Sequence, residues 1–175
     1  VAILNNGKYG YGFDGSTASI NLLRSPDNPD PQADRGEHRF TYALVPHAGH
    51  FTAAGTIARA YELNAPIQAW PVARRGGTMA AAGSFFTLES VNDHVIVESI
   101  KRAHDDADAV VVRLYEAHRR RGQATLRSMA KVRKAQVVDL LERPMESIKA
   151  SGGAVTLAFR PFEIKTVKLW LSAGV

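Results

Sequence analysis

Residues 24–50 read RSPDNPDPQADRGEHRFTYALVPHAGH, a loop rich in proline followed by the pattern of a β-strand. Three prolines lie within six residues near its start. Because proline fixes φ and lacks an N–H donor, the loop is stiff and cannot enter the interior of a sheet. It leads into residues 39–45, where Phe40, Tyr42 and Leu44 occupy alternate positions, the pattern of a half-buried strand. The stretch therefore predicts a rigid loop that presents charged side chains at the mouth of a β-strand.

Similar short runs continue along the chain on both sides of this strand. Strands are expected from alternating or β-branched runs at residues 1–4, 8–13, 17–23, 39–45, 85–89, 94–103, 109–117, 123–129, 134–141, 154–159 and 164–171. Short strands separated by turn residues at near-regular spacing are typical of a sandwich or a barrel. No helices alternate with the strands, so the pattern does not favour a doubly wound α/β sheet.

One segment departs from the strand pattern. In residues 53–63 the apolar side chains fall at the i, i+3, i+4 and i+7 positions of an amphipathic helix. Thr52 stands just before this segment and is the expected N-cap. The sequence therefore predicts an all-β protein with a β-sandwich fold and one short helix near 53–63.

Residues 71–83 are rich in glycine and alanine and are expected to form a loop, and the strand pattern is weakest over residues 72–93. A chain of this length can form one large domain or two small ones. We place a domain boundary within residues 72–93, which gives two β-domains at residues 1–90 and 91–175.

The composition limits the classes of function. The 175 residues include no cysteine, which excludes disulfides and thiolate metal sites and fits a cytoplasmic protein. The net charge of +5 is modest, and we expect no nucleic-acid partner. No apolar run approaches the roughly 18 residues of a membrane-spanning helix, so no membrane partner is expected. The first residue is Val1, and we expect an excised C-terminal piece whose targeting signal, if any, lies upstream.

Several stretches resemble the C-terminal β region of the α-mannosidases of glycoside hydrolase family 38, especially their bacterial and cytosolic branch. The most specific is LLRSPDNPDPQADRGEHRFTYALVPHAG at 22–49, in which a proline-studded loop is followed by DRGEH and then FTYALVPHAG. The others keep the family's order along the chain: LNNGKYGYGF at 4–13, AYELNAP at 60–66, VVVRLYEAH at 110–118, DLLER at 139–143 and PFEIKTVKL at 161–169.

The resemblance implies a parent enzyme that hydrolyses α-linked mannose with retention of configuration. Such an enzyme uses two carboxyl groups roughly 5–5.5 Å apart. In the family these groups, and a divalent metal that is usually zinc, belong to an N-terminal catalytic domain. We therefore expect no catalytic residue, metal ligand or cofactor in this chain, and expect the chain to be inactive alone.

The same resemblance assigns the two predicted domains. It implies that residues 1–90 are the end of a large β-sandwich and residues 91–175 a smaller terminal β-sandwich. Both are expected to pack on the parent's own catalytic domain and to shape the rim of the active site that receives the α-mannoside. We expect the parent to be a bacterial, cytoplasmic enzyme, and its homo-oligomeric state stays open.

The charged loop supplies the site candidates Asp34, Arg35, Glu37 and His38, and the corner after the strand adds His47. One interpretation is a rim of donors and acceptors for sugar hydroxyls or a polar joint to the catalytic domain. The other is a loop locked by its own ion pairs, with Arg35 bidentate to Asp34 or Glu37. Loop residues permit both interpretations.

The other polar clusters do not match known ligand motifs. The spacings between His38, His47 and His50 fit no zinc motif, for which four ligands are usual. The aspartates of residues 105–108 lack the glycine and the later glutamate of a calcium loop, and we expect a solvated turn.

Two further patterns each have two interpretations. Tyr9, Tyr11 and Phe13 share one face of a predicted strand, and this stripe is either part of a core or a platform that stacks on sugars; a core is favoured. The basic run Arg119–Arg121 is expected to keep a hairpin tip soluble. The aromatic stripe and the sandwich pattern also support a rival function, a free-standing carbohydrate-binding or scaffold module.

Overall fold

The run AVVVRLYE forms β7 (Ala109–Glu116), an inner strand of the larger of the chain's sheets. A computed structural model of the chain describes residues 1–73, 76 and 82–172. The chain divides into unit 1 (Val1–Pro71) and unit 2 (Val72–Val175), and β7 belongs to unit 2. β7 pairs antiparallel with one neighbour on each side, so its β-branched residues lie inside the sheet, where such side chains pack well.

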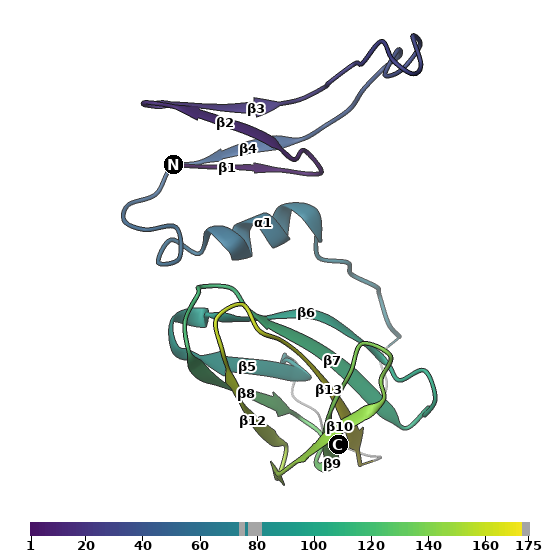
Figure 1. Cartoon of the computed structure of the whole chain (residues 1–175). Coiled ribbons are helices and arrows are strands. Elements are labelled where there is room, and N and C mark those ends of the chain that lie inside the picture. The colour runs from purple at the N-terminus through teal and green to yellow at the C-terminus, as the bar shows by residue number, and fades with distance from the viewer. Residues whose placement is uncertain (74–75, 77–81, 173–175) are drawn as a thin grey trace. The chain divides into compact units, whose positions relative to one another are not determined.

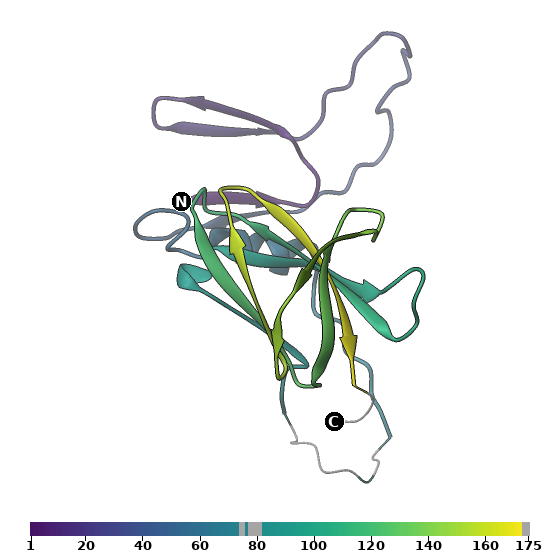
Figure 2. The same ribbon diagram turned by 60° about the horizontal axis from the view of Figure 1, so that its bottom comes forward.

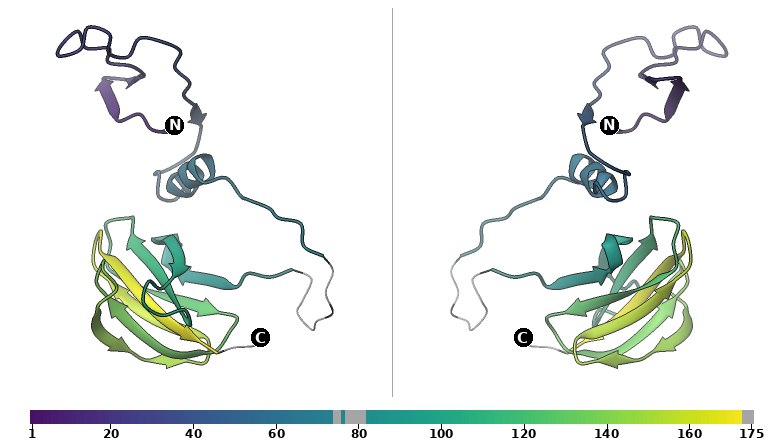
Figure 3. Two further views of the ribbon diagram at one scale, coloured as in Figure 1. Left: turned by 90° about the vertical axis from the view of Figure 1, so that its right-hand side faces the viewer. Right: turned by 90° about the vertical axis from the view of Figure 1, so that its left-hand side faces the viewer.

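Unit 2 contains two sheets, which face each other in Figures 2 and 3. The larger has the order β10-β9-β13-β7-β6. Its other strands are β6 (Val95–Arg102), β9 (Val132–Val138), β10 (Pro144–Ile148) and β13 (Ile164–Leu171). The smaller has the order β11-β12-β8-β5. Its strands are β5 (Phe86–Ser90), β8 (Gly122–Ser128), β11 (Ala150–Ser151) and β12 (Ala154–Phe159), and the short 3-10 helix η1 (Val91–Asp93) follows β5.

The core of unit 2 lies between these sheets. Leu114 and Leu169 enter it from the larger sheet, and Leu126, Leu157 and Phe159 enter it from the smaller one. All five side chains are buried. Full burial of one such side chain contributes roughly 1.5–3 kcal/mol. This apolar layer confirms the predicted all-β sandwich.

A second, smaller apolar cluster includes Ala109 and Val111 of β7, with Trp170 packed against it. The Trp170 ring nitrogen donates a 2.7 Å hydrogen bond to Asp106, and the Lys134 ammonium lies 4.2 Å from the ring centroid. Asp105 pairs with Lys168 of β13. The turn that was expected to be merely solvated is therefore tied to the sheet by two of its carboxylates.

Unit 1 is built from two separate strand pairs and one helix (Figure 1). The first pair joins β1 (Ala2–Asn5) to β4 (Tyr42–Val45), and the second joins β2 (Gly10–Asp14) to β3 (Thr17–Asn21); both are antiparallel. The helix α1 (Thr56–Asn64) contacts β1, and the Asn64 side-chain amide donates a 3.0 Å hydrogen bond to the carbonyl of Asn5.

The predicted helix is present, but its predicted N-cap is wrong. Gly55, in the left-handed region at φ 64°, precedes the first helical residue, and no side chain caps the helix. Thr52 lies further upstream, where its hydroxyl is hydrogen-bonded to His50 Nδ1 at 2.9 Å. Thr52 is thus part of the preceding turn, and glycine provides the backbone conformation that starts the helix.

Burial in unit 1 differs from the expectation. On β4, Tyr42 and Leu44 are exposed, whereas Ala43 and Val45 on the opposite face are half-buried. Ala43 lies opposite Leu4 in the strand pair, so the covered face holds the smaller side chains. Alternation correctly indicates which residues share a face, but it does not indicate which face is covered.

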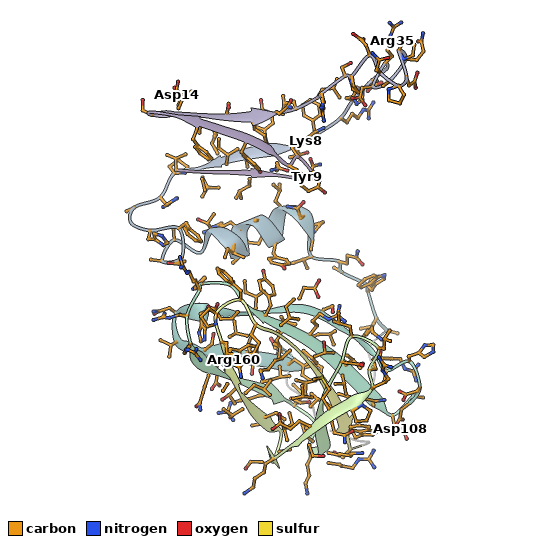
Figure 4. The ribbon with its side chains drawn as sticks, in the orientation of Figure 1. Lys8, Tyr9, Asp14, Arg35, Asp108 and Arg160 are labelled. Carbon is orange, nitrogen blue, oxygen red and sulfur yellow. The ribbon has the colours of Figure 1, made fainter. Side chains whose placement is uncertain are left out.

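The aromatic stripe that was favoured as core is also exposed. Tyr9 retains 91% of its accessible surface, Phe13 retains 80% and Tyr11 retains 46%. β2 and β3 form an isolated two-stranded ribbon, so no second layer of described residues covers this face. Figure 4 shows Tyr9 at one end of the ribbon and Asp14 at the other.

The division between the units also differs from the predicted boundary at 90/91. β5 pairs with β8, so the sandwich of unit 2 already includes residues 86–90. Much of the loop expected at 71–83 lies outside the described residues. None of the described helices is both long and apolar enough to cross a membrane.

Candidate functional site

The DRGEH loop of unit 1 is closed by its own hydrogen bonds. A carboxylate oxygen of Asp34 accepts a 2.9 Å bond from the backbone N–H of Ser25, which joins the two ends of the proline-rich loop. His38 Nε2 lies 2.7 Å from the carbonyl oxygen of Asp34, and since a carbonyl only accepts, Nε2 is the donor. Asp34 adopts the left-handed conformation at φ 59°, which aspartate tolerates better than most residues. These contacts give the loop a defined shape.

The considered pairing of Arg35 with Asp34 or Glu37 is wrong, because Glu37 pairs with a different arginine. Glu37 forms its ion pair with Arg39, at 2.6 Å, and both side chains are well exposed. Arg35 contributes a backbone N–H to the carbonyl of Gln32 at 3.2 Å, and Figure 4 shows it at the far tip of the loop. An exposed ion pair adds little stability because solvent screens it. The Arg35 guanidinium is therefore not engaged by the loop's two acidic side chains.

His47 occupies the other corner. Its Nδ1 lies 3.4 Å from the carbonyl oxygen of Ala48, and the side chain is half-buried. In the part of the chain that the structure describes, no hydrogen bond joins His47 to residues 34–38, and no group of three or more His, Asp or Glu side chains could hold a metal ion. The structure thus brings Asp34 and His38 together. Among the described residues, no hydrogen bond or ion pair joins the side chain of Arg35 or His47 to either of them.

Unit 2 contains a polar centre that sequence reasoning missed. Glu116, at the end of β7, is 0% exposed. One of its carboxylate oxygens accepts the backbone N–H of His118 at 2.8 Å, and the other accepts that of Phe162 at 2.9 Å. Burial raises the pKa of Glu116, but the backbone N–H groups of Phe162, His118 and Arg120, with the nearby His94, lower that pKa below its ordinary value overall. Glu116 is a buried carboxylate satisfied by main-chain donors.

His94 lies beside this carboxylate and is 1% exposed. Its Nδ1 is 3.0 Å from the carbonyl of Val91 and must be the donor there, which leaves Nε2 without a partner among the described residues. A Cβ added to Gly122 would lie 2.6 Å from His94 Nε2, so only glycine fits at the start of β8. Burial lowers the pKa of the neighbouring His118.

A surface cleft of about 490 Å³ opens where the β7–β8 and β12–β13 loops meet. Its lining includes Arg121, Gly122, Gln123, Phe159, Arg160 and Lys165. Glu163 also lines it, accepting the backbone N–H of Arg160 at 2.7 Å and pairing with Lys165 at 3.4 Å. The sequence carried one signal for the centre around Glu116, because this glutamate follows Val110, Val112 and Leu114 on the inward, otherwise apolar face of β7.

The comparisons with known proteins agree with this architecture. The family description "Glycosyl hydrolases family 38 C-terminal beta sandwich domain" matches residues 94–167, which lie within unit 2. Alpha-mannosidase 2C1 of Mus musculus is 38% identical over 177 residues, covering 99% of this chain and 17% of the relative. Alpha-mannosidase 2C1 of Homo sapiens is 38% identical (98% and 16%), and alpha-mannosidase G of Dictyostelium discoideum is 34% identical (96% and 16%).

The chain thus spans about one sixth of the length of the curated relatives it matches, and the matches include both units. The predicted resemblance is confirmed by the family match, by the identity across nearly the whole chain and by the sandwich itself. Residues 94–167 therefore form the C-terminal β-sandwich domain described for glycosyl hydrolase family 38, and the chain as a whole is similar to α-mannosidases.

Proposed function

We propose that this chain is the non-catalytic C-terminal region of a retaining α-mannosidase, and that it packs on the parent's catalytic domain and shapes the active-site rim. The relatives are named α-mannosidases, and the chain corresponds to only 16–17% of their length. The proposed parent hydrolyses α-linked mannose, and its location is proposed to be cytoplasmic, which fits the absence of cysteine.

The observation that carries this proposal is the missing core of unit 1. Among the described residues of unit 1 only Leu4 is buried, while large apolar side chains on β2 and β4 remain exposed. A two-stranded ribbon is at best marginally stable alone and needs more strands or a packed helix. Contiguous exposed apolar faces mark interaction surfaces. We therefore assign these faces to contact with other layers of the parent enzyme.

The catalytic carboxylates and the divalent metal, proposed to be zinc, are assigned to the catalytic domain. The described residues of this chain offer no set of three ligands, so they do not fit the metal, and no step of catalysis is derived from them. The proposed contribution of Asp34, Glu37 and His38 is positional, because the loop they form has a fixed shape and an exposed surface.

Hydrolysis of an aryl α-mannoside by the purified chain and by the full-length parent tests the assignment. We expect turnover by the parent and none by the chain, with or without added Zn²⁺. Turnover by these 175 residues would contradict the non-catalytic role. In the parent, Arg35→Ala is expected to raise KM or lower kcat if the loop tip forms the rim, and the matched variant Arg59→Ala on exposed α1 serves as its control.

A second candidate function follows from the exposed stripe of Tyr9, Tyr11 and Phe13, because exposed aromatic rings can stack on sugars. In this alternative the chain is a carbohydrate-binding module. Calorimetry with mannose oligosaccharides separates the two functions. Micromolar binding that is lost in Phe13→Ser supports the module, whereas no binding by the chain supports the packing role.

A further inference from the structure

The two loops at one end of unit 2 are held together from beneath by a single carboxylate. Glu116 binds the backbone N–H of His118 in the β7–β8 loop and that of Phe162 in the β12–β13 loop. Figures 1 and 2 show these loops side by side at the same end of the sandwich. A buried carboxylate is costly unless its oxygens are satisfied. Here the donors come from both loops, so their shapes are fixed together.

The cleft lies between these loops and has an unequal charge. Arg121 comes from the first loop, and Arg160 begins the second; Lys165 follows on β13. Glu163 is the one carboxylate among the lining residues, and Lys165 already pairs with it. In the described part of the chain no ion pair engages the side chain of Arg121 or Arg160. Glu163 also attracts Arg160 electrostatically, but the lining holds three cationic side chains against this one carboxylate, so the cleft keeps an excess of positive charge.

The remaining lining suits a small ligand. Gly122 has no side chain, Phe159 is buried, and Gln123 provides an amide. The volume of about 490 Å³ lies within the range of small-molecule sites, roughly 300–1,000 Å³. Guanidinium groups bind phosphate and carboxylate oxygens through paired, charge-assisted hydrogen bonds, which are stronger than neutral ones.

We propose that this cleft is a binding site for a small ligand that carries a phosphate or carboxylate group, with Arg121 and Arg160 as its principal donors. Lys165 pairs with Glu163, so these two side chains largely balance each other at the side of the cleft. Glu116 is a positioning residue, since it touches the loops and not the ligand. The proposal rests on unit 2 alone and does not depend on the function proposed above.

Calorimetry on the 175-residue chain at constant ionic strength tests the site. The probes are inorganic phosphate, mannose 6-phosphate, glucuronate and, as the neutral counterpart, mannose. We expect saturable binding of at least one anionic probe and none of mannose. Tighter binding of mannose 6-phosphate than of glucuronate identifies phosphate as the ligand group, and the reverse order identifies carboxylate.

Variants decide whether the cleft is responsible. Arg121→Gln and Arg160→Gln are each expected to weaken binding by about tenfold, the loss of one charge-assisted interaction. Arg59→Gln removes the same charge from an exposed position on helix α1 and is expected to leave binding unchanged. Exposed substitutions of this kind seldom affect folding, and thermal unfolding of each variant verifies this. Absence of saturable anion binding, or equal weakening by all three variants, would overturn the proposal.

Discussion

The two units of this chain use the same strand pattern and differ in what covers it. In unit 2 the alternating faces of two sheets meet, and side chains such as Leu114 and Leu126 are 0% and 1% exposed. In unit 1 similar faces carry Leu44 at 66% and Phe13 at 80% exposure. Alternation therefore specifies a strand but not a core. A core requires a second layer, and among the described residues only unit 2 contains one.

The largest expected effect is a core truncation in unit 2. Leu126→Ala is expected to lower the free energy of unfolding by about 3 kcal/mol, because it leaves a cavity between the two sheets. Leu44→Ala in unit 1 is the matched control, expected to cost less than about 0.5 kcal/mol in this chain. Urea unfolding followed by circular dichroism measures both. Equal losses would show that the contrast between the units is wrong.

Next in size is Glu116→Gln, which removes the charge from the buried carboxylate but keeps its shape. Charge-assisted bonds are stronger than neutral ones, so we expect a loss of about 2 kcal/mol at pH 7. Because the folded-state pKa of Glu116 is lowered, its contribution is present above the pKa of the unfolded state, near 4.3, and is lost as pH falls through the folded-state pKa.

Unfolding measured from pH 7 down to pH 3 tests that sign. The difference in the free energy of unfolding between the unsubstituted 175-residue chain and its Glu116→Gln variant should shrink as the pH falls. A difference that stays constant or grows on acidification would contradict the assignment of Glu116 as an ionised anchor of the two loops.

A somewhat smaller loss is expected from Gly122→Ala. The new methyl group would lie 2.6 Å from His94 Nε2 and 2.9 Å from Cε1, so the buried ring must move. Overpacking of this kind costs about 1–3 kcal/mol. Gly83→Ala is the control, since its Cβ would meet only the end of Met129 at 3.4 Å. Differential scanning calorimetry should show a clear drop in Tm for the first variant alone.

The smallest effect in this chain, and the sharpest test of the comparison, is Phe13→Ser. Because the ring is largely exposed, we expect a change below about 0.5 kcal/mol in the 175-residue chain. In the full-length parent the same substitution is expected to lower Tm by several degrees, since we propose that this face is covered there. An unchanged Tm in the parent would remove the main support for the packing role.

Much of the fold was predictable because strands leave a local signal. The β-branched run of β7 and the alternation of β12 and β13 identified strands near their observed bounds. β10 and β11 were missed. The sequence PMESI of β10 is mostly exposed and lies at a sheet edge, so its pairing with β9 defines it as a strand. The two compact units divide before β5, earlier along the chain than the predicted boundary, because the pairing of β5 with β8 is non-local.

In the candidate site, too, local contacts leave a signal in the sequence and non-local contacts do not. A loop around Asp34 locked by its own contacts was one of two interpretations, with Arg35 as the expected partner, and the contacts observed are those of Asp34 with Ser25 and His38. Glu37 has an arginine on each side at similar distance along the chain, and sequence alone did not distinguish Arg35 from Arg39. The centre at Glu116 joins residues 46 positions apart through Phe162, and no local pattern could reveal that bond.

The edge strand β10 also bears on how unit 2 stays in solution. An edge strand offers unpaired N–H and C=O groups on which another chain can pair and begin an aggregate. β10 opens with Pro144, which has no N–H, and its register shifts between Pro144 and Glu146, where a charged, exposed side chain follows. Each of these features discourages addition of a foreign strand. The β10 edge of the sandwich can therefore be exposed to solvent without pairing with a strand of another chain.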